Sequence, residues 1–505
     1  MKLDGRKTGA VVIFLLTVLW LRWIIASRFS ITFDEGIYVE GSRRILAGAA
    51  PYRDFFILMG PGTFWLQALA LRILGISLAA SRAVLILDLA ILTACVFWLV
   101  ARHAGLAYAA WTAALLLILE TADQGIMIPS HRWDSAALLA LAITMCAWRA
   151  GRYAVFAAGC CAAFAAWTTP PVALVGLAIL IWLCAETRAT ALSFLAGVAA
   201  VSACCAGALA MQGALGPMIA QLLWDRSHYA GANALPYGSL FGAGYGQFFD
   251  GASIYELPLR ALVVFGFILP ILLPPIAALS FPAWRGTPEL RLLFFGGAAL
   301  VASTYPRMDL PHLTYAAPLF CALLAILAAS MPWPKLRTGL FIGGNLLAVI
   351  FVWSALAQRS REVSIDTNAG RIRAVEQDAV FVRGLEREIP RGSTLFVFPY
   401  LPIANFLTLT RNPTRYSYLQ PGMMSDRDEA AVLADLRKNP PARVLYFDFK
   451  EKELLATWPA TDPARCRFPA LEKYLAANYH RVSAIQTSKR TFDVLEPNAT
   501  LLGHR

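Results

Sequence analysis

The sequence AVVIFLLTVLWLRWIIASRFSITFDEG, residues 10–36, decides the fold class because it joins a bilayer-length apolar run to a pair of acids. The apolar run Ala10–Ala26 is preceded by basic residues, which predicts a membrane helix with a cytoplasmic N-terminus. A cleaved signal peptide is the alternative, but no clear small-x-small site follows. Asp34 and Glu35 open the next loop, where a carboxylate just outside the bilayer is well placed to activate a hydroxyl group.

The composition indicates a membrane domain followed by a soluble domain. The 505 residues are 58% hydrophobic and 15% charged, whereas a soluble domain carries about 25% charged residues. Residues 358–505 contain 22 Lys/Arg and 17 Asp/Glu, about half of the charged residues of the chain. We therefore predict a transmembrane domain over residues 1–357 and a small extracytoplasmic α/β domain over residues 358–505.

Further apolar segments predict an α-helical polytopic membrane protein with about eleven transmembrane helices. The loops assigned to the cytoplasm are basic throughout, and an odd number of spans places the C-terminal domain outside the cytoplasm. The segment Pro61–Gly75 is short and contains Gln67 and Arg72, so we expect an amphipathic interfacial helix there. After Ala10–Ala26, the expected spans are 80–101, 105–121, 135–149, 153–169, 171–185, 190–211, 257–281, 291–305, 312–331 and 338–357.

The C-terminal domain shows strand-like runs at 394–398 and 444–449 and helical patterns at 426–438 and 469–478. Strands that alternate with helices are typical of a small α/β domain. Neither a phosphate-binding Gly-rich loop nor a nucleophile elbow is found in this domain.

The net charge of +12 does not indicate nucleic-acid binding, because most basic residues of the membrane domain flank spans and set its orientation. Eight of the nine cysteines lie in apolar runs, and only Cys466 lies in the soluble part. Such cysteines usually act as small hydrophobic residues, so we predict neither a disulfide framework nor a zinc site.

Candidate binding residues gather in the expected outer loops. Tyr52, Arg53 and Asp54 combine aromatic, basic and acidic groups that suit a sugar-phosphate pocket, although a simple turn after Pro51 explains them equally well. The loop at 129–134 contains His131, Arg132, Trp133 and Asp134, and arginine binds phosphate as a bidentate fork. An acid at the start of a span, such as Asp134, is costly unless it is paired or solvated.

A third outer loop contains Arg307, Asp309 and His312. An arginine on the outer side opposes the usual charge bias, so it calls for an explanation such as phosphate binding. A local ion pair between Arg307 and Asp309 is the alternative.

The order and placement of these motifs resemble the GT-C superfamily of membrane glycosyltransferases, over about residues 8–330. The most similar members are bacterial relatives of the protein mannosyltransferases, the aminoarabinose transferase of lipid A and the rhizobial lipopolysaccharide galacturonosyltransferases. The sequence departs from the aminoarabinose transferase at Met59-Gly60-Pro61-Gly62, where that enzyme has an acidic-basic pair before Pro-Pro. The motifs that carry the resemblance are Phe33-Asp34-Glu35, Gly48-x-x-Pro51-Tyr52-Arg53-Asp54, Gly60-Pro61, Ser81-Arg82, Asp134 and Arg307-x-Asp309-x-x-His312.

The resemblance implies an inverting transfer of a sugar from a polyprenyl-phosphate donor to a hydroxyl of an envelope glycan, lipid or protein. Such enzymes act on the extracytoplasmic face of the bacterial inner membrane, where a donor is expected to be lipid-linked. Asp34 would be the general base, with Glu35 beside it, and cations would stabilise the phosphate leaving group. The implied donor-phosphate residues are His131, Arg132, Arg307 and His312, and the implied substrate-binding residues are Tyr52, Arg53, Asp54, Asp134 and Asp309.

No cofactor is demanded by the residue spacing. A divalent metal is compatible with the resemblance, and Asp34 with Asp134 would then hold it. Two other functions remain open at this point. A transporter or flippase of lipid-linked glycans would place polar residues within the membrane and often shows inverted repeats. A noncatalytic assembly protein would bind a partner through its outer domain.

Overall fold

The computed structural model describes residues 4–122, 127–148, 151–239, 249–487 and 490–499. Contacts between residues divide the chain into two compact units. The chain crosses from the first unit to the second for the last time between Ala357 and Gln358, where the sequence predicts a domain boundary. Unit 1 comprises Met1–Ile24, Leu85–Gly207 and Leu235–Ala357, and unit 2 comprises Ile25–Val84, Ala208–Ala234 and Gln358–Arg505.

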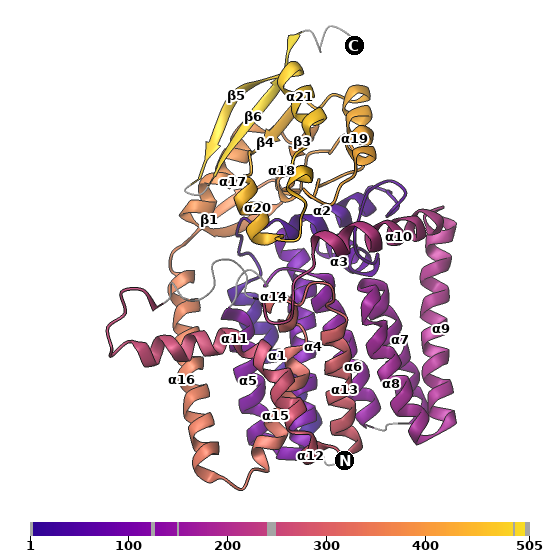
Figure 1. The fold of residues 1–505 in the computed structure, drawn as a ribbon, viewed down its shortest axis with the longest axis vertical. Helices are drawn as coiled ribbons and strands as arrows, with labels where there is room; N and C mark the ends of the chain where they lie inside the picture. The colour runs from indigo at the N-terminus through magenta and orange to yellow at the C-terminus, as the bar shows by residue number, and fades with distance from the viewer. Residues whose placement is uncertain (1–3, 123–126, 149–150, 240–248, 488–489, 500–505) are drawn as a thin grey trace. The chain divides into compact units, whose positions relative to one another are not determined.

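Unit 1 is built from helices, and the chain is a multi-pass membrane protein (Figure 1). Among the described residues, five helices are long and apolar enough to cross a membrane: α1 (Gly5–Ile24), α4 (Leu78–Ala104), α9 (Arg188–Met211), α11 (Leu257–Leu279) and α16 (Pro334–Arg359). The first two turns of α4 (residues 78–84) and the last turn of α9 (residues 208–211) belong to unit 2. The other helices are α5 (Leu106–Ala122), α6 (His131–Trp148), α7 (Arg152–Thr168), η1 (Pro170–Val172), α8 (Ala173–Glu186), α12 (Phe281–Trp284), α13 (Pro288–Ala302), α14 (Leu310–Thr314) and α15 (Ala317–Ala329).

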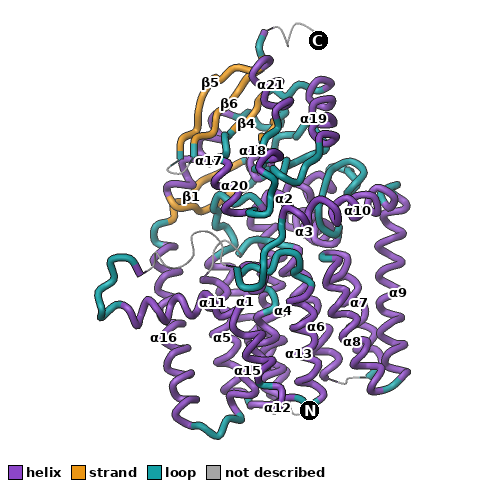
Figure 2. Tube along the Cα trace, in the orientation of Figure 1, coloured by secondary structure: helices purple, strands orange, loops and turns teal. Residues whose placement is uncertain are grey.

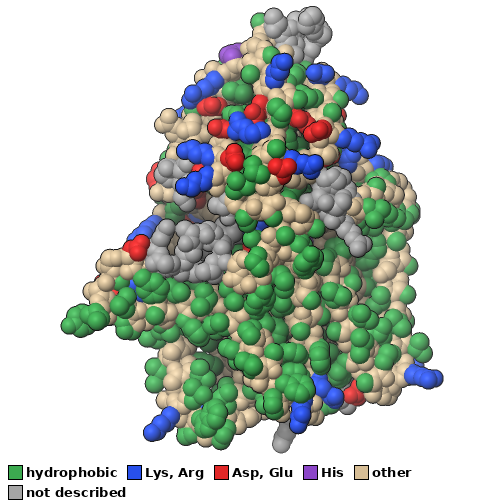
Figure 3. All heavy atoms as spheres, in the orientation of Figure 1, with side chains coloured by type: hydrophobic (Ala, Val, Ile, Leu, Met, Phe, Trp, Pro, Cys, Tyr) green, Lys and Arg blue, Asp and Glu red, His purple; other side chains and the backbone are tan. Residues whose placement is uncertain are grey.

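Each segment expected to span the membrane coincides with a helix, although the number of eleven crossings remains a prediction. Large apolar side chains point outward from these helices, as expected where lipid rather than water surrounds them. On α16, for example, Val349 and Trp353 are 66% and 74% exposed. Figure 3 shows hydrophobic side chains across the visible surface of the unit 1 helices.

Among the residues that the structure describes, the strands all lie after residue 361, in unit 2 (Figure 2). β1 (Glu362–Thr367) and β2 (Gly370–Val375) form an antiparallel hairpin. The main sheet has the order β3-β4-β6-β5, in which β3 (Leu395–Phe398) and β4 (Arg443–Tyr446) are parallel and β5 (Tyr479–Gln486) and β6 (Thr491–Pro497) are antiparallel. The helices that follow residue 375 are α17 (Glu376–Glu388), α18 (Ile403–Thr408), α19 (Asp426–Lys438), α20 (Glu451–Thr457), η3 (Pro463–Arg465) and α21 (Pro469–Asn478). The predicted small α/β domain is confirmed.

Unit 2 also contains three helices from earlier in the chain: α2 (Asp34–Leu46), α3 (Gly62–Leu74) and α10 (Leu215–Ala232). α3 lies within the predicted amphipathic segment, with Phe64 and Leu71 buried while Leu69 and Ile73 are more than half exposed.

The first loop and the C-terminal sheet share one hydrophobic core. Phe29, Val39 and Phe56 belong to the same buried cluster as the sheet residues. α2 approaches α18 so closely that a Cβ atom on Gly36 would lie 2.2 Å from the backbone nitrogen of Ile403. Only glycine permits this contact between two backbones.

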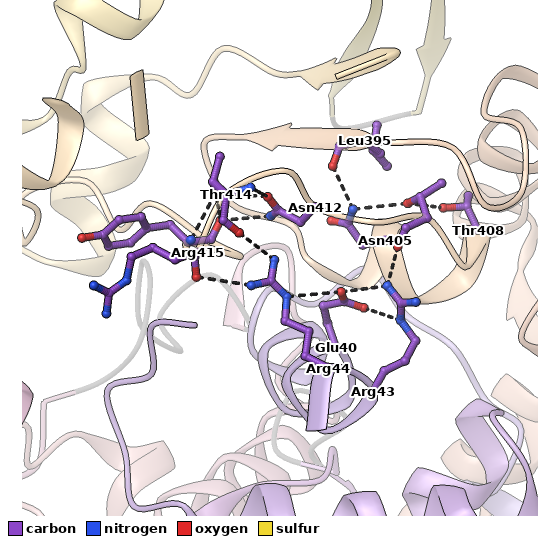
Figure 4. Close-up of polar contacts among 11 residues, drawn as sticks. Glu40, Arg43, Arg44, Leu395, Asn405, Thr408, Asn412, Thr414 and Arg415 are labelled. Atoms are coloured by element: carbon purple, nitrogen blue, oxygen red, sulfur yellow. Dashed lines mark hydrogen bonds and ion pairs between the residues drawn. The ribbon is translucent and has the colours of Figure 1, made fainter. Parts of the chain in front are cut away.

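The C-terminal half of α2 is joined to the segment 405–415 by hydrogen bonds (Figure 4). Glu40 is buried and pairs with Arg43 through two hydrogen bonds of 2.8 and 2.9 Å. Arg43 donates to the carbonyl oxygen of Thr410, and Arg44 donates to that of Thr414 at 3.0 Å. α2 is therefore part of the same rigid packing as the sheet.

Candidate functional site

Asp34 and Glu35 occupy the first turn of α2, where negative charge interacts favourably with the helix dipole. Their surroundings differ. Asp34 is exposed, whereas Glu35 is fully buried and receives two hydrogen bonds of 2.8 Å from Arg82. Arg82 is itself 2% exposed and donates to the carbonyl oxygen of Ile25 at 3.1 Å. The structure therefore presents one accessible carboxylate beside a second that is held in an ion pair.

Tyr52, Arg53 and Asp54 form a turn in unit 2. Tyr52 has a φ of 65°, is buried, and donates from its hydroxyl to the carbonyl oxygen of Met59 at 2.7 Å. Arg53 and Asp54 are exposed and pair at 2.7 Å. Hydrogen bonding from Arg53 lowers the pKa of Asp54. The turn presents Arg53 and Asp54 to the surface, while Tyr52 lies inside.

In unit 1, Arg307, Asp309 and His312 form a connected cluster at the start of α14. Arg307 Nε donates to Asp309 Oδ2 at 2.7 Å, and His312 Nδ1 contacts Asp309 Oδ1. Asp309 also caps α14 through the backbone N–H of His312. The ion pair considered from the sequence is thus present, together with a histidine on the same carboxylate.

The charges of this cluster are set by its burial and its neighbours. Burial alone would raise the pKa of Asp309, but hydrogen bonds and positive charge from His312 and Arg307 outweigh it and lower the pKa to about 2. Burial lowers the pKa of His312 to about 4, and the charge of Arg132 acts in the same direction. At neutral pH the cluster therefore contains a neutral imidazole, a carboxylate and a guanidinium.

His131, Arg132 and Asp134 lie in the first turn of α6. His131 Nδ1 is 2.7 Å from Thr169 Oγ1, and Trp133 packs against Tyr315 with ring centroids 4.6 Å apart. The Trp133–Tyr315 contact and the charge of Arg132 at His312 show that this loop and the Arg307 cluster converge within unit 1. The structure thus brings together the predicted residues His131, Arg132, Asp134, Arg307, Asp309 and His312.

Asp134 is 1% exposed and shares a hydrogen bond with the carboxyl group of Asp88 on α4. The sequence shows Asp88 within a span but gives no sign of its partner. Thr169 contacts His131, and Arg82 contacts Glu35. Of these two partners, only Arg82 could be found from the sequence, where it belongs to the motif Ser81-Arg82.

The described residues contain no group of three or more His, Cys, Asp or Glu side chains suited to hold a metal ion. Asp134 is engaged with Asp88. The proposed metal pair, Asp34 and Asp134, is divided between unit 2 and unit 1.

A shallow groove of about 580 Å³ lies in unit 1 between the start of α8 and the end of α13. Its lining is mostly apolar, and it ends at Ser303 and Tyr305, close in sequence to Arg307. The lining residues are Pro170, Pro171, Ala173, Leu174, Leu177, Ala302, Ser303 and Tyr305. Such a groove can accept an aliphatic chain.

No protein-family model matches the sequence, and no curated protein matches it. Solved structures do. The chain is similar to ArnT from Cupriavidus metallidurans bound to undecaprenyl phosphate, with a TM-score of 0.57, 13% identity, and 98% and 99% of the two chains covered. The apo state of the same protein gives a TM-score of 0.56 at 14% identity, with 98% and 99% covered. The Archaeoglobus fulgidus oligosaccharyltransferase in complex with Zn and sulfate gives 0.49 at 14% identity, with 96% of this chain and 72% of that chain covered. The predicted resemblance is confirmed in the fold: over nearly its whole length, this chain has the fold of ArnT.

Proposed function

We propose that the protein is a membrane glycosyltransferase that moves a hexosyl or pentosyl group from a polyprenyl-phosphate donor to a hydroxyl acceptor. The observation that carries the proposal is the exposed Asp34 beside the buried Glu35–Arg82 pair, in a chain with the fold of a protein crystallised with undecaprenyl phosphate. The acceptor would be an envelope glycan, a lipid or a protein, and the reaction would take place on the extracytoplasmic side of the bacterial inner membrane.

Asp34 would act as the general base. Its carboxylate takes the proton of the acceptor hydroxyl while the new glycosidic C–O bond forms and the sugar–phosphate C–O bond breaks. The phosphate leaves with the electron pair, and the configuration at the anomeric carbon inverts. Glu35 would position the first turn of α2 through Arg82 rather than take part directly.

Arg307 and Arg132 would bind the donor phosphate through their guanidinium groups, and His312 and His131 would lie beside it in the same cluster. The apolar groove between α8 and α13 supports a lipid-linked donor because its lining suits a polyprenyl chain. Asp134, Asp309, Tyr52, Arg53 and Asp54 would contact the substrates. A divalent metal remains compatible with the proposal, but no step of the mechanism requires it.

The test uses purified protein in lipid nanodiscs with a panel of radiolabelled undecaprenyl-phosphate sugars. The envelope fraction of a strain that lacks the gene serves as acceptor. We expect transfer by the wild type and at least about a 100-fold loss in Asp34→Asn, the range for removal of a general base. Asp366→Asn is the matched control, because Asp366 is an exposed strand residue. Full transfer activity in Asp34→Asn would refute the assignment of the base, and the anomeric configuration of the product tests inversion.

A transporter or lipid-linked glycan flippase is the second candidate function. The buried Asp88–Asp134 pair favours it, because acids within membrane helices often mark ion or proton pathways. Movement of a labelled lipid-linked sugar across proteoliposomes, without any glycosylated product, would support this function over transfer.

A further inference from the structure

Residues from the C-terminal part of unit 2 lie directly beside Asp34. Tyr400 contacts Phe33, the residue before Asp34, with ring centroids 4.5 Å apart, and it contacts Trp458 at 6.3 Å. The guanidinium of Arg490 lies over the rings of Phe33 and Phe447, 5.5 Å from each centroid. We call Phe33, Tyr400, Phe447, Trp458 and Arg490 the aromatic cluster.

The position of the aromatic cluster relative to Asp34 is fixed by packing. Gly36 contacts the backbone of Ile403, three residues after Tyr400. The other end of α2 is held by Arg43 and Arg44, as Figure 4 shows. Both neighbours of the cluster in the chain, α2 and the segment before α18, therefore belong to the shared core of unit 2.

The cluster combines buried support with accessible groups. Phe447 is 1% exposed and Tyr400 is 7% exposed, whereas Phe33, Trp458 and Arg490 are half-buried and Asp34 is exposed. Half-buried aromatic rings offer an apolar face of fixed orientation, and a neighbouring guanidinium and phenol offer hydrogen-bond donors. An apolar face with donors at its edge suits a sugar ring.

The charges beside Asp34 indicate which kind of sugar would fit. Arg490 pairs with Glu453 at 3.0 Å, so the one cation of the aromatic cluster is already matched by a carboxylate. Burial and the negative charge of Asp34 raise the pKa of Tyr400 to about 12, although Arg490 opposes the shift, so the phenol is neutral. A ligand with its own negative charge would be repelled.

We propose that the aromatic cluster is the acceptor subsite, and that it binds an uncharged sugar ring whose hydroxyl faces Asp34. The proposal rests on the function proposed above and adds the place and the class of the acceptor. Trp458 supplies the apolar face, and Arg490 and Tyr400 bind ring hydroxyls. Asp34 then accepts the proton of the hydroxyl that attacks the donor sugar.

The test separates the acceptor from the donor. Slow hydrolysis of the undecaprenyl-phosphate sugar by water needs no acceptor subsite, whereas transfer to the envelope fraction does. We expect Trp458→Ala to lower transfer at least 10-fold through a higher KM for the acceptor, with donor hydrolysis within twofold of wild type. Trp458→Tyr should restore most of the transfer. Trp353→Ala is the control, because Trp353 is an exposed tryptophan on α16.

Unchanged transfer in Trp458→Ala, or an equal loss of transfer and hydrolysis, would overturn the subsite. If Trp458→Ala does not fold, Arg490→Gln in the same two assays decides the question, with the same expected loss of transfer alone. A wild-type protein that neither transfers nor hydrolyses the donor would instead refute the proposed function itself.

The class of acceptor is tested by competition. Methyl glucopyranoside should inhibit transfer at millimolar concentration, and methyl glucuronide, which carries a carboxylate, should inhibit at least 10-fold less. Stronger inhibition by the glucuronide would overturn the assignment to an uncharged ring.

Discussion

The buried ion pair between Glu35 and Arg82 allows a quantitative prediction for Arg82→Met. The change leaves the Glu35 carboxylate without its two 2.8 Å hydrogen bonds at a site that is 0% exposed. Removal of one partner of a buried ion pair typically costs about 3–5 kcal/mol, since the remaining charge has no compensation. We expect a loss of this size in the free energy of unfolding, measured by denaturant titration of the protein in detergent micelles.

The double variant Glu35→Leu/Arg82→Met tests the cause of that loss. Because it removes both charges, we expect it to be at least about 1.5 kcal/mol more stable than Arg82→Met, as buried ion pairs replaced by apolar residues are often tolerated. Arg371→Gln is the control, since the Arg371–Asp366 pair is exposed and should leave stability unchanged. A double variant no more stable than Arg82→Met would refute the reasoning.

Two further predictions concern packing and pH. Gly36→Ala should lower the free energy of unfolding by about 1–3 kcal/mol, because its Cβ atom would overlap the backbone of Ile403. Gly207→Ala is the control and should be neutral or slightly stabilising, because its Cβ atom would meet no atom within 4 Å. Equal unfolding curves for the two variants would contradict this. The pKa of His312 falls from 6.5 to about 4 on folding and that of Asp309 from 3.8 to about 2, so the deprotonated forms favour the folded state. The contribution of His312 to the free energy of unfolding should therefore be fully present above pH 6.5. It should fall by roughly 3 kcal/mol as the pH decreases to 4. His312→Gln should flatten the unfolding free energy between pH 6.5 and 4, and an unchanged slope would contradict the assignment.

The helices of unit 1 could be predicted from the sequence because their apolar runs are long and lie between basic turns. The same holds for α19 and α21, whose bounds match the helical patterns of the sequence, and for β3 and β4, which contain the apolar runs 395–398 and 444–446. β5 and β6 were not predicted. The sequence of β5, YHRVSAIQ, mixes polar and apolar residues because β5 is an edge strand with exposed positions. β6, TFDVLEP, lies inside the sheet, and its buried Phe492 and Val494 alternate with less buried residues.

The candidate site could be predicted only as separate motifs. Arg307, Asp309 and His312 lie within six positions of one another, so their cluster follows from local spacing. The different surroundings of Asp34 and Glu35 could not be predicted, because they depend on Arg82, 47 positions later. Convergence of the 131–134 loop with the Arg307 cluster likewise depends on helix packing, which the sequence does not reveal.

The association of the first loop with the C-terminal sheet also could not be predicted from the sequence. Three residues of α2 make this association. Gly36 contacts the backbone of Ile403, and Arg43 and Arg44 donate hydrogen bonds to carbonyl oxygens. Neither kind of contact can be predicted from the sequence, because the main-chain atoms of any residue type can serve as the partner. The predicted division at residue 357 thus remains a prediction, while the structure groups residues 25–84 with the segment after it.

The hydrogen bond between Arg43 and Thr410 joins residues that are 367 positions apart, and this separation has a consequence for biosynthesis. At the usual speed of translation, about 5–20 residues per second, α2 emerges roughly 20–70 seconds before its partner. During that interval Phe29, Val39 and Phe56 have no sheet to cover them. The nascent first loop would therefore depend on a chaperone or on the membrane surface, and a stop codon before residue 400 would leave an intact set of membrane helices with an exposed, protease-sensitive loop.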